Sequence, residues 1–529
     1  MSILDSAARP ARRKSRPLEQ KNIDLTQGPI LKGMALFFLP ILLGSLMQQL
    51  YVTVDAIVIG QFVGKAGLAA VDCVFNLCRL PVTFFVGLSA GAGIIVAQCF
   101  GSRSLDRLSK IIHTSMIFSV LAGLFLSALG ILSRHVAISF LNVPEEIAPI
   151  TNTYLIIYFA GLSFVTVYNL ASGVLRAIGD SKTPFWSLGI ASFINIGLDL
   201  LFVAVFSWGV AGAAIATLIA QACSAIYVVV VMAKKRSLSE LAGSKLNEDG
   251  VFDQIEQEQE DAELGIKREL EKKFELYEAC RLSWSKMRIS GQELKHVVLL
   301  GLPVAFQSSL YTMANMYVQS AANATGTDNI AAWSLVGKLD IVIWLILEAL
   351  TIVVTTFCAQ NYGAKKRERL IKGVHYAMLS SCLIVGVLAA ILYLLSKPLG
   401  LVFLGEKDIE IVYLASNLLA FVAPFYICIV PSEIWSSQIR ATGHTIAPMV
   451  LTLLSVFGTR LLWTGLVVPS WPYHLSNLNI ATFHNDVIHV VVAVYPVSWI
   501  AVTLCIGAYY LYFKHRYLKD KQLPEPRID

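Results

Sequence analysis

The sequence predicts an all-α membrane protein in which twelve transmembrane helices form two parallel six-helix repeats, arranged as two lobes. Three observations predict this class: an apolar composition, twelve long apolar runs and an internal repeat. Hydrophobic residues make up 56% of the 529 residues and charged residues only 15%, whereas soluble domains carry about 25% charged residues. A chain of this composition is expected to lie in a lipid bilayer.

Twelve apolar runs are each long enough to cross a bilayer, which takes roughly 20 residues in a helix. Because the runs are continuous and do not alternate every second residue, they favour helices over the strands of a β-barrel. The runs cover residues 29–58, 67–100, 107–133, 147–178, 184–206, 210–233, 296–322, 329–361, 368–395, 410–442, 446–468 and 486–513.

Lysine and arginine in the loops predict the orientation of the helices. Basic clusters occur in the N-terminal tail and after every second run, and the other loops are nearly free of them. Since basic loops stay in the cytoplasm, both termini are expected there, in a multi-pass protein of the cell membrane. The N-terminal tail lacks the apolar core of a signal peptide, so no signal peptide is expected. The basic loops explain the net charge of +6, so no nucleic-acid partner is expected.

An internal repeat divides the chain into two halves. LYVTVDAIV aligns with LYTMANMYV 260 residues later, IIVAQCFG with TFCAQNYG at 262, and VLRAIGDSKTP with QIRATGHTIAP at 264. An even number of helices in each half gives both halves the same orientation, so they are parallel repeats with a cleft between two lobes. The expected parts are a basic tail (1–28), a first lobe (29–233), a linker (234–295), a second lobe (296–513) and a C-terminal tail (514–529).

The linker, residues 234–295, carries 12 basic and 14 acidic residues. Its few apolar side chains are too little for a core, so a solvated helix or a partly disordered connection is expected. A regulatory or membrane-surface role is the weaker alternative.

A few carboxylates lie inside the apolar runs, where an ionisable group is costly and marks a functional site. Asp199 has Asn195 one helical turn before it. Thr217 lies in the next run, about as far from the short connection as Asp199, roughly 13 Å at 1.5 Å per residue. Asp55 is expected in the same outer half of the lobe, with Tyr51 one turn earlier on the same face.

Oxygen groups from these residues suit a hard monovalent cation such as Na+. Two close carboxylates in an apolar pocket alternatively hold a proton. A third reading is that Asp199 and Asn195 only form hydrogen bonds between helices.

The repeat places Asn315, Thr459 and Trp463 at the positions of Asp55, Asn195 and Asp199. The second lobe therefore has no copy of the ion site.

Three acids of the second lobe, Asp340, Glu348 and Glu433, are candidates for attracting a cationic substrate. The alternative is neutralisation by a basic residue, for instance Lys338, Arg79 or Arg460. In the first run, Pro40 removes a backbone hydrogen bond fifteen residues before Asp55 and is a candidate hinge.

The chain resembles the multidrug and toxic compound extrusion (MATE) family, in its prokaryotic DNA-damage-inducible (DinF-like) branch. The resemblance lies in Pro40 with Asp55, in RAIGDSKTP, in NIGLDLLF followed by GVAGAAIAT, and in RATG at Arg440 to Gly443. Leu200 stands where the family often has proline.

The resemblance implies a V-shaped twelve-helix antiporter, expected as a monomer, that exports organic cations in exchange for Na+ or H+. Its cation site corresponds to Asp55, Asn195, Asp199 and Thr217, which would be the Na+ ligands of a sodium-coupled protein, and its bending proline to Pro40.

Two other functions are weighed against export. A lipid-linked saccharide flippase of the same superfamily would need a cleft lined with arginine and lysine, which the runs mostly lack. A membrane enzyme or channel is disfavoured because no HExxH, GxSxG, Walker-type or filter-like loop occurs. The nine cysteines form no CxxC or Cys/His cluster, so no cofactor is expected beyond the coupling ion.

Overall fold

The computed structural model describes residues 23–141, 143–234, 274–404, 409–470 and 487–518, and every regular element within them is helical. The first half contains α1 (Ile30–Phe62), α2 (Lys65–Ser102), α3 (Leu105–Phe140), α4 (Ala148–Ala177), α5 (Lys182–Asp199) and α6 (Gly209–Ala233). The second half contains α9 (Gly291–Asn323), α10 (Thr327–Gly363), α11 (Arg367–Leu404), α12 (Ile409–Val422), α13 (Tyr426–Ala441), α14 (Ile446–Thr452), α15 (Thr459–Leu462), α17 (Val487–Val492) and α18 (Val494–Tyr517).

Twelve helical stretches of the described chain are long and apolar enough to cross a membrane, and each coincides with one predicted run. The predicted fold class is confirmed. Several helices are longer than the runs, as where α3 continues past residue 133 to Phe140. The apolar run measures the thickness of the bilayer, whereas a helix continues into polar sequence wherever its side chains find partners. Arg134 of α3, for example, donates to Asn152 Oδ1 at 3.0 Å.

Two of the spans contain π-helical turns. In the first lobe, α5 continues directly into a π-helix at Leu200–Val205. In the second lobe, the span that begins with α14 contains two π-helices, Leu453–Gly458 and Trp463–Val467, on either side of α15. Such turns are rare in proteins, and those that occur often lie at functional sites.

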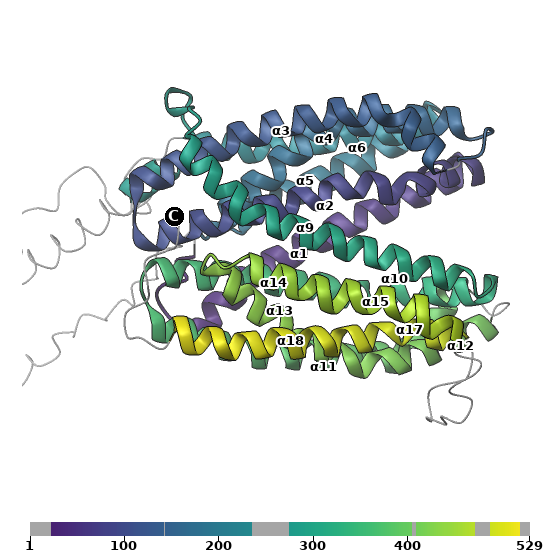
Figure 1. Cartoon of the computed structure of the whole chain (residues 1–529). Helices are drawn as coiled ribbons and strands as arrows, with labels where there is room; N and C mark the ends of the chain where they lie inside the picture. The colour runs from purple at the N-terminus through teal and green to yellow at the C-terminus, as the bar shows by residue number, and fades with distance from the viewer. Residues whose placement is uncertain (1–22, 142, 235–273, 405–408, 471–486, 519–529) are drawn as a thin grey trace, which may run out of the picture.

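The helices form two lobes that lie side by side, with α2 to α6 in one and α10 to α18 in the other, and α1 and α9 run obliquely between them (Figure 1). The lobes meet where α9 packs against α2. A Cβ atom added to Gly91 would overlap the backbone of Gly301, and one added to Gly87 would fall 2.9 Å from the carbonyl carbon of Val304. Small residues thus let the two backbones touch, as between membrane helices generally.

The lobes also meet at the end of the molecule where the described basic loops lie. We call it the basic end; its loops carry Arg103, Arg107, Lys110, Lys182, Lys234, Lys365, Lys366, Arg367 and Arg369. Here α2 and α10 cross through their repeated Ala-Gln-x-x-Gly sequences. Gln98 Nε2 donates to Ala441 O at 2.7 Å, and Gln360 Nε2 donates to Ala177 O at 2.8 Å. The two contacts are equivalent in the repeat, and each joins one lobe to the other.

The glycines of the same repeated sequence make this crossing close. A Cβ atom added to Gly101 would overlap the carbonyl of Gln360, and one added to Gly363 would overlap the carbonyl of Gln98. Any side chain at either position therefore separates the two helices.

Residues 23–28, the described part of the predicted N-terminal tail, tie both lobes together at the basic end. Ile23 N donates to Gly179 O of the first lobe at 2.9 Å. Leu25 N donates to Gln360 Oε1 at 3.2 Å, and Arg369 donates to Gly28 O at 2.7 Å. This short segment belongs to the fold, and the rest of the tail lies outside the described residues.

The last part of the linker packs on the first lobe at the basic end. After a helix at residues 274–280, Leu282 N donates to Met232 O at 2.9 Å, and Ser283 N donates to His113 Nε2 at 3.0 Å. Cys280 is buried in this contact, and residues 235–273 lie outside the described chain.

Cys280 reports whether the linker is docked. We expect a variant that keeps only this cysteine to react slowly with a maleimide in the folded protein, because burial raises the pKa of its thiol to about 12 and the thiolate is the reactive form. A matched variant with Ser285→Cys, on the exposed turn that follows, is expected to react fast. Equal labelling rates would show that the linker does not stay docked.

Candidate functional site

Asp199 and Asn195 lie at the end of α5, one turn apart, and both side chains are fully buried. Both carboxylate oxygens of Asp199 and the amide oxygen of Asn195 lack a hydrogen-bond partner among the described residues. Three buried acceptor atoms without donors are costly to keep out of water. The π-helix at Leu200–Val205 begins directly after Asp199.

Two further helices complete the cluster. From α6, Thr217 Oγ1 accepts a hydrogen bond from Asn195 Nδ2 at 3.3 Å. From α1, Asp55 lies within electrostatic reach of Asp199, and one of its carboxylate oxygens is buried without a partner. Tyr51, one turn before Asp55, lies within reach of that carboxylate. The structure therefore brings together the four residues of the predicted cation site, with Tyr51 beside Asp55.

This cluster contains carboxylate, amide and hydroxyl oxygens. Neither of its two carboxylates forms an ion pair with a basic side chain of the described residues. Buried charges of one sign need a partner of the other sign. The donor set is the one that hard cations prefer, and a proton on one carboxylate would equally remove the repulsion. We refer to Asp55, Asn195, Asp199 and Thr217 as the acidic site.

The three acids predicted to attract a substrate in the second lobe all have neighbours in this structure. Asp340 accepts hydrogen bonds from Trp344 Nε1 at 3.1 Å and Tyr426 Oη at 2.7 Å. Glu348 lies within electrostatic reach of Arg79 and Arg176, and Glu433 within reach of Arg440. Their contact with a substrate stays a prediction.

Arg460 pairs with none of these acids. It is fully buried in α15, and Asn315 supplies one of its hydrogen-bond acceptors. In the sequence it is a single arginine inside an apolar run, which predicts only a neutralising partner for one of the three acids.

Pro40 lies inside α1, which is helical from Ile30 to Phe62. Its role as a hinge stays a prediction.

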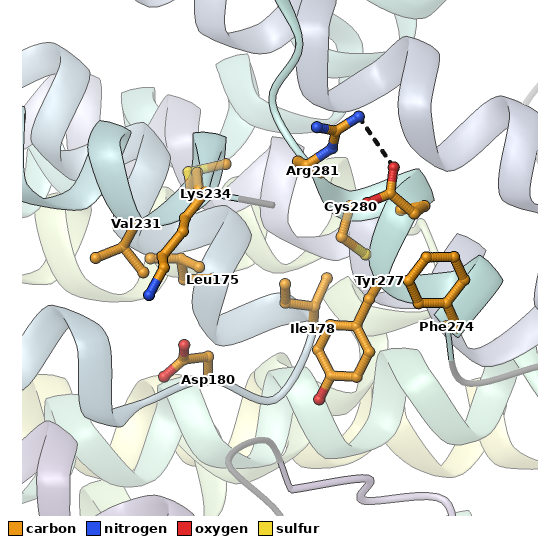
Figure 2. Close-up of a pocket in the computed structure, with 11 residues that line it drawn as sticks. Leu175, Ile178, Asp180, Val231, Lys234, Phe274, Tyr277, Cys280 and Arg281 are labelled. Carbon is orange, nitrogen blue, oxygen red and sulfur yellow. Dashed lines mark ion pairs between the residues drawn. The ribbon is translucent and has the colours of Figure 1, made fainter. Parts of the chain in front are cut away.

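Two hollows of the described chain lie away from the acidic site. One cavity of about 40 Å³ opens between α4, α6 and the linker at the basic end (Figure 2). It is lined by Asp180, Lys234 and Cys280 among others, and has room for only a few water molecules. A wider groove of about 860 Å³ runs along Lys365–Lys372. Neither contains a residue of the acidic site.

Comparison with known proteins gives the duplicated architecture a family. Residues 40–201 and 303–464, one stretch in each lobe, both match the family described as MatE. The chain belongs to the MatE family. Its members are transporters and not enzymes.

Two curated relatives come from Bacillus subtilis. The probable multidrug resistance protein YoeA is 26% identical to this MatE chain over 81% of its length and 85% of the relative. The probable multidrug resistance protein YpnP is also 26% identical, over 84% and 90%. Among solved structures, a crystal structure of MATE in complex with MaL6 superposes with a TM-score of 0.76 at 18% identity, covering 94% of this chain and 98% of the other. This likeness establishes the shared fold.

Proposed function

We propose that this MatE protein exports amphipathic organic molecules, foremost organic cations, in exchange for inward Na+ or H+. The observation that carries the proposal is the acidic site, where buried oxygens of Asp55, Asn195 and Asp199 lack partners. A site with unmet acceptors and two acidic groups has a reason to bind and release a small cation. The two relatives from Bacillus subtilis are named as probable multidrug resistance proteins, which supports organic molecules as the cargo.

Na+ and H+ would use the same atoms in different ways. Na+ needs several oxygens at once, and Asp55, Asp199, Asn195 and Thr217 would supply them. A proton needs only one carboxylate, which it neutralises. The two ions would therefore compete, and each would lower the repulsion between Asp55 and Asp199.

The contact between the lobes supports alternating access. The positive-inside rule makes the basic end cytoplasmic, which would also put both termini in the cytoplasm. At that end the Gln98 and Gln360 contacts and residues 23–28 join the lobes. The lobes are then joined at the cytoplasmic end in this conformation, and loading of cargo from the cytoplasm would require these bonds to break. Cation binding at the acidic site would shift the balance between the two states.

The decisive test uses purified protein in vesicles loaded with a cationic dye. With a Na+ gradient or a pH gradient imposed alone, we expect one of them to drive dye transport in the wild type. Asp199→Asn is expected to reduce driven transport to the leak rate, because it removes a charge from the acidic site. Asp328→Asn, on the exposed start of α10, is the charge-matched control and should transport normally. Undiminished transport by Asp199→Asn would refute the site.

A further inference from the structure

The second lobe contains a buried positive charge that no acid of the described residues pairs with. Arg460 is 0% exposed, and it lies in the short α15 between the two π-helices of its span. No carboxylate of the described chain forms an ion pair with it. Removing an unpaired charge from water is costly, so its surroundings need an explanation.

Neighbouring side chains use part of the guanidinium. Its centre lies 4.9 Å from the ring centroid of Tyr311 and 4.6 Å from that of Tyr495, so both rings stabilise the cation. It donates to Asn315 Oδ1 and, at 3.4 Å, to Ser498 Oγ. These contacts are neutral, and the Nη2 atom is buried with no hydrogen-bond partner.

Two more buried donors nearby also lack partners in the described structure. They are the hydroxyl of Tyr311, whose ring stacks on the guanidinium, and the Nε1 atom of Trp499, whose ring centroid is 6.0 Å from that of Tyr495. Asp340, which like Arg460 lies within electrostatic reach of Tyr495, is already bonded to Trp344 and Tyr426. Unmet donors around an uncompensated cation call for an acceptor with negative charge.

The internal repeat makes this the opposite of the acidic site. Asn315 occupies the position of Asp55, and Trp463 that of Asp199, so both acidic groups are missing. Arg460 instead corresponds to the apolar Ile196. One lobe thus buries negative charge without a basic partner, and the other buries positive charge without an acidic one.

We propose that the second lobe contains an anion-binding site formed by Arg460 Nη2 with the donors of Tyr311 and Trp499. Its ligand is a small monovalent anion, supplied either as a free halide or as the carboxylate of a transported molecule. The second source rests on the proposed export function, whereas the site itself does not. A transported molecule with one positive and one negative group would then meet an acidic site in the first lobe and a basic site in the second.

The test measures thermal unfolding of the purified full-length protein by tryptophan fluorescence, without any gradient. The reference salt is sodium isethionate, whose anion is a sulfonate. It is replaced stepwise by sodium bromide or sodium acetate at constant Na+ and ionic strength. We expect a saturable rise in the unfolding midpoint with at least one of them, because a ligand that binds only the folded state stabilises it. A rise with bromide alone indicates a free halide, and a stronger rise with acetate indicates a carboxylate ligand.

Three variants decide whether Arg460 is responsible. Arg460→Gln is expected to weaken the apparent affinity by more than about tenfold, which corresponds to one lost charge-assisted hydrogen bond. Arg440→Gln, which removes another arginine of the same lobe, should keep the effect. Asn315→Asp places a carboxylate beside the guanidinium and is informative even if Arg460→Gln does not fold. This variant should raise the midpoint in isethionate and abolish the response to bromide and acetate.

The proposal is overturned if neither salt shifts the midpoint of the wild type, or if the shift persists in Asn315→Asp. It is equally overturned if a folded Arg460→Gln variant keeps the response. None of these results bears on gradient-driven transport, so the acidic site and the anion site stand or fall separately.

Discussion

Replacing Gly363 by alanine is expected to prevent the two lobes from closing at the basic end. The added Cβ atom would overlap the backbone carbonyl of Gln98, and a backbone atom cannot rotate away as a side chain can. The helices α2 and α10 must then separate, which strains or breaks the bonds of Gln98 and Gln360 to the opposite lobe. We expect a loss of about 3 kcal/mol in the stability of the closed state, at the upper end of overpacking effects.

The separation can be measured as a distance between spin labels. Asp106 and Glu368 are equivalent in the repeat, exposed, and at the starts of α3 and α11, so labels there report the gap between the lobes. The distance should lengthen in Gly363→Ala and in its repeat equivalent Gly101→Ala. Gly337→Ala is the matched control, since it lies in the same helix α10 with nothing within 4 Å of an added Cβ. An unchanged distance in both test variants would contradict the closed crossing.

The membrane spans and the repeat were predictable because bilayer physics constrains them directly. A span must be apolar for about 20 residues, and the loops between spans carry the orientation in their charges. Helical spacing was enough to place Asn195 beside Asp199, and distance along the chain placed Thr217 at the same depth. The repeat also aligned Gln98 with Gln360, but only the structure shows that each bonds to the opposite lobe.

Features that depend on neighbours from distant sequence were not predictable. A π-helix differs from an α-helix by one residue per turn, and Leu200–Val205 has no distinctive composition. Arg460 and the acids of its lobe are all visible in the sequence, but which of them meet is decided by how the spans pack. The structure places Glu433 near Arg440 and leaves Arg460 with aromatic rings, which no local pattern specifies.

Neutralising the acidic site is expected to stabilise the ion-free protein. Asp199 and Asp55 carry like charges within electrostatic reach of each other, and neither forms an ion pair in the described structure. Asp199→Asn removes one buried charge together with the repulsion, which should raise the free energy of unfolding by about 3 kcal/mol at alkaline pH. The proposed cation binding depends on the repulsion between Asp55 and Asp199, so the more stable variant is expected to be the inactive one.

A double-mutant cycle separates repulsion from burial. The first substitution, Asp55→Asn or Asp199→Asn, relieves both the repulsion and the burial of one charge, whereas the second relieves only burial. The double variant should therefore gain less than the sum of the single gains, by about 1–3 kcal/mol. Na+ should reduce the difference in unfolding free energy between the variants and the wild type, because it stabilises the wild type by binding. A ligand at 100 times its dissociation constant adds about 2.7 kcal/mol. Additive gains would mean that the two carboxylates do not sense each other, and a loss of stability in either single variant would mean that its carboxylate already has a partner. In the second case the acidic site would have no unmet charge for a coupling ion to neutralise.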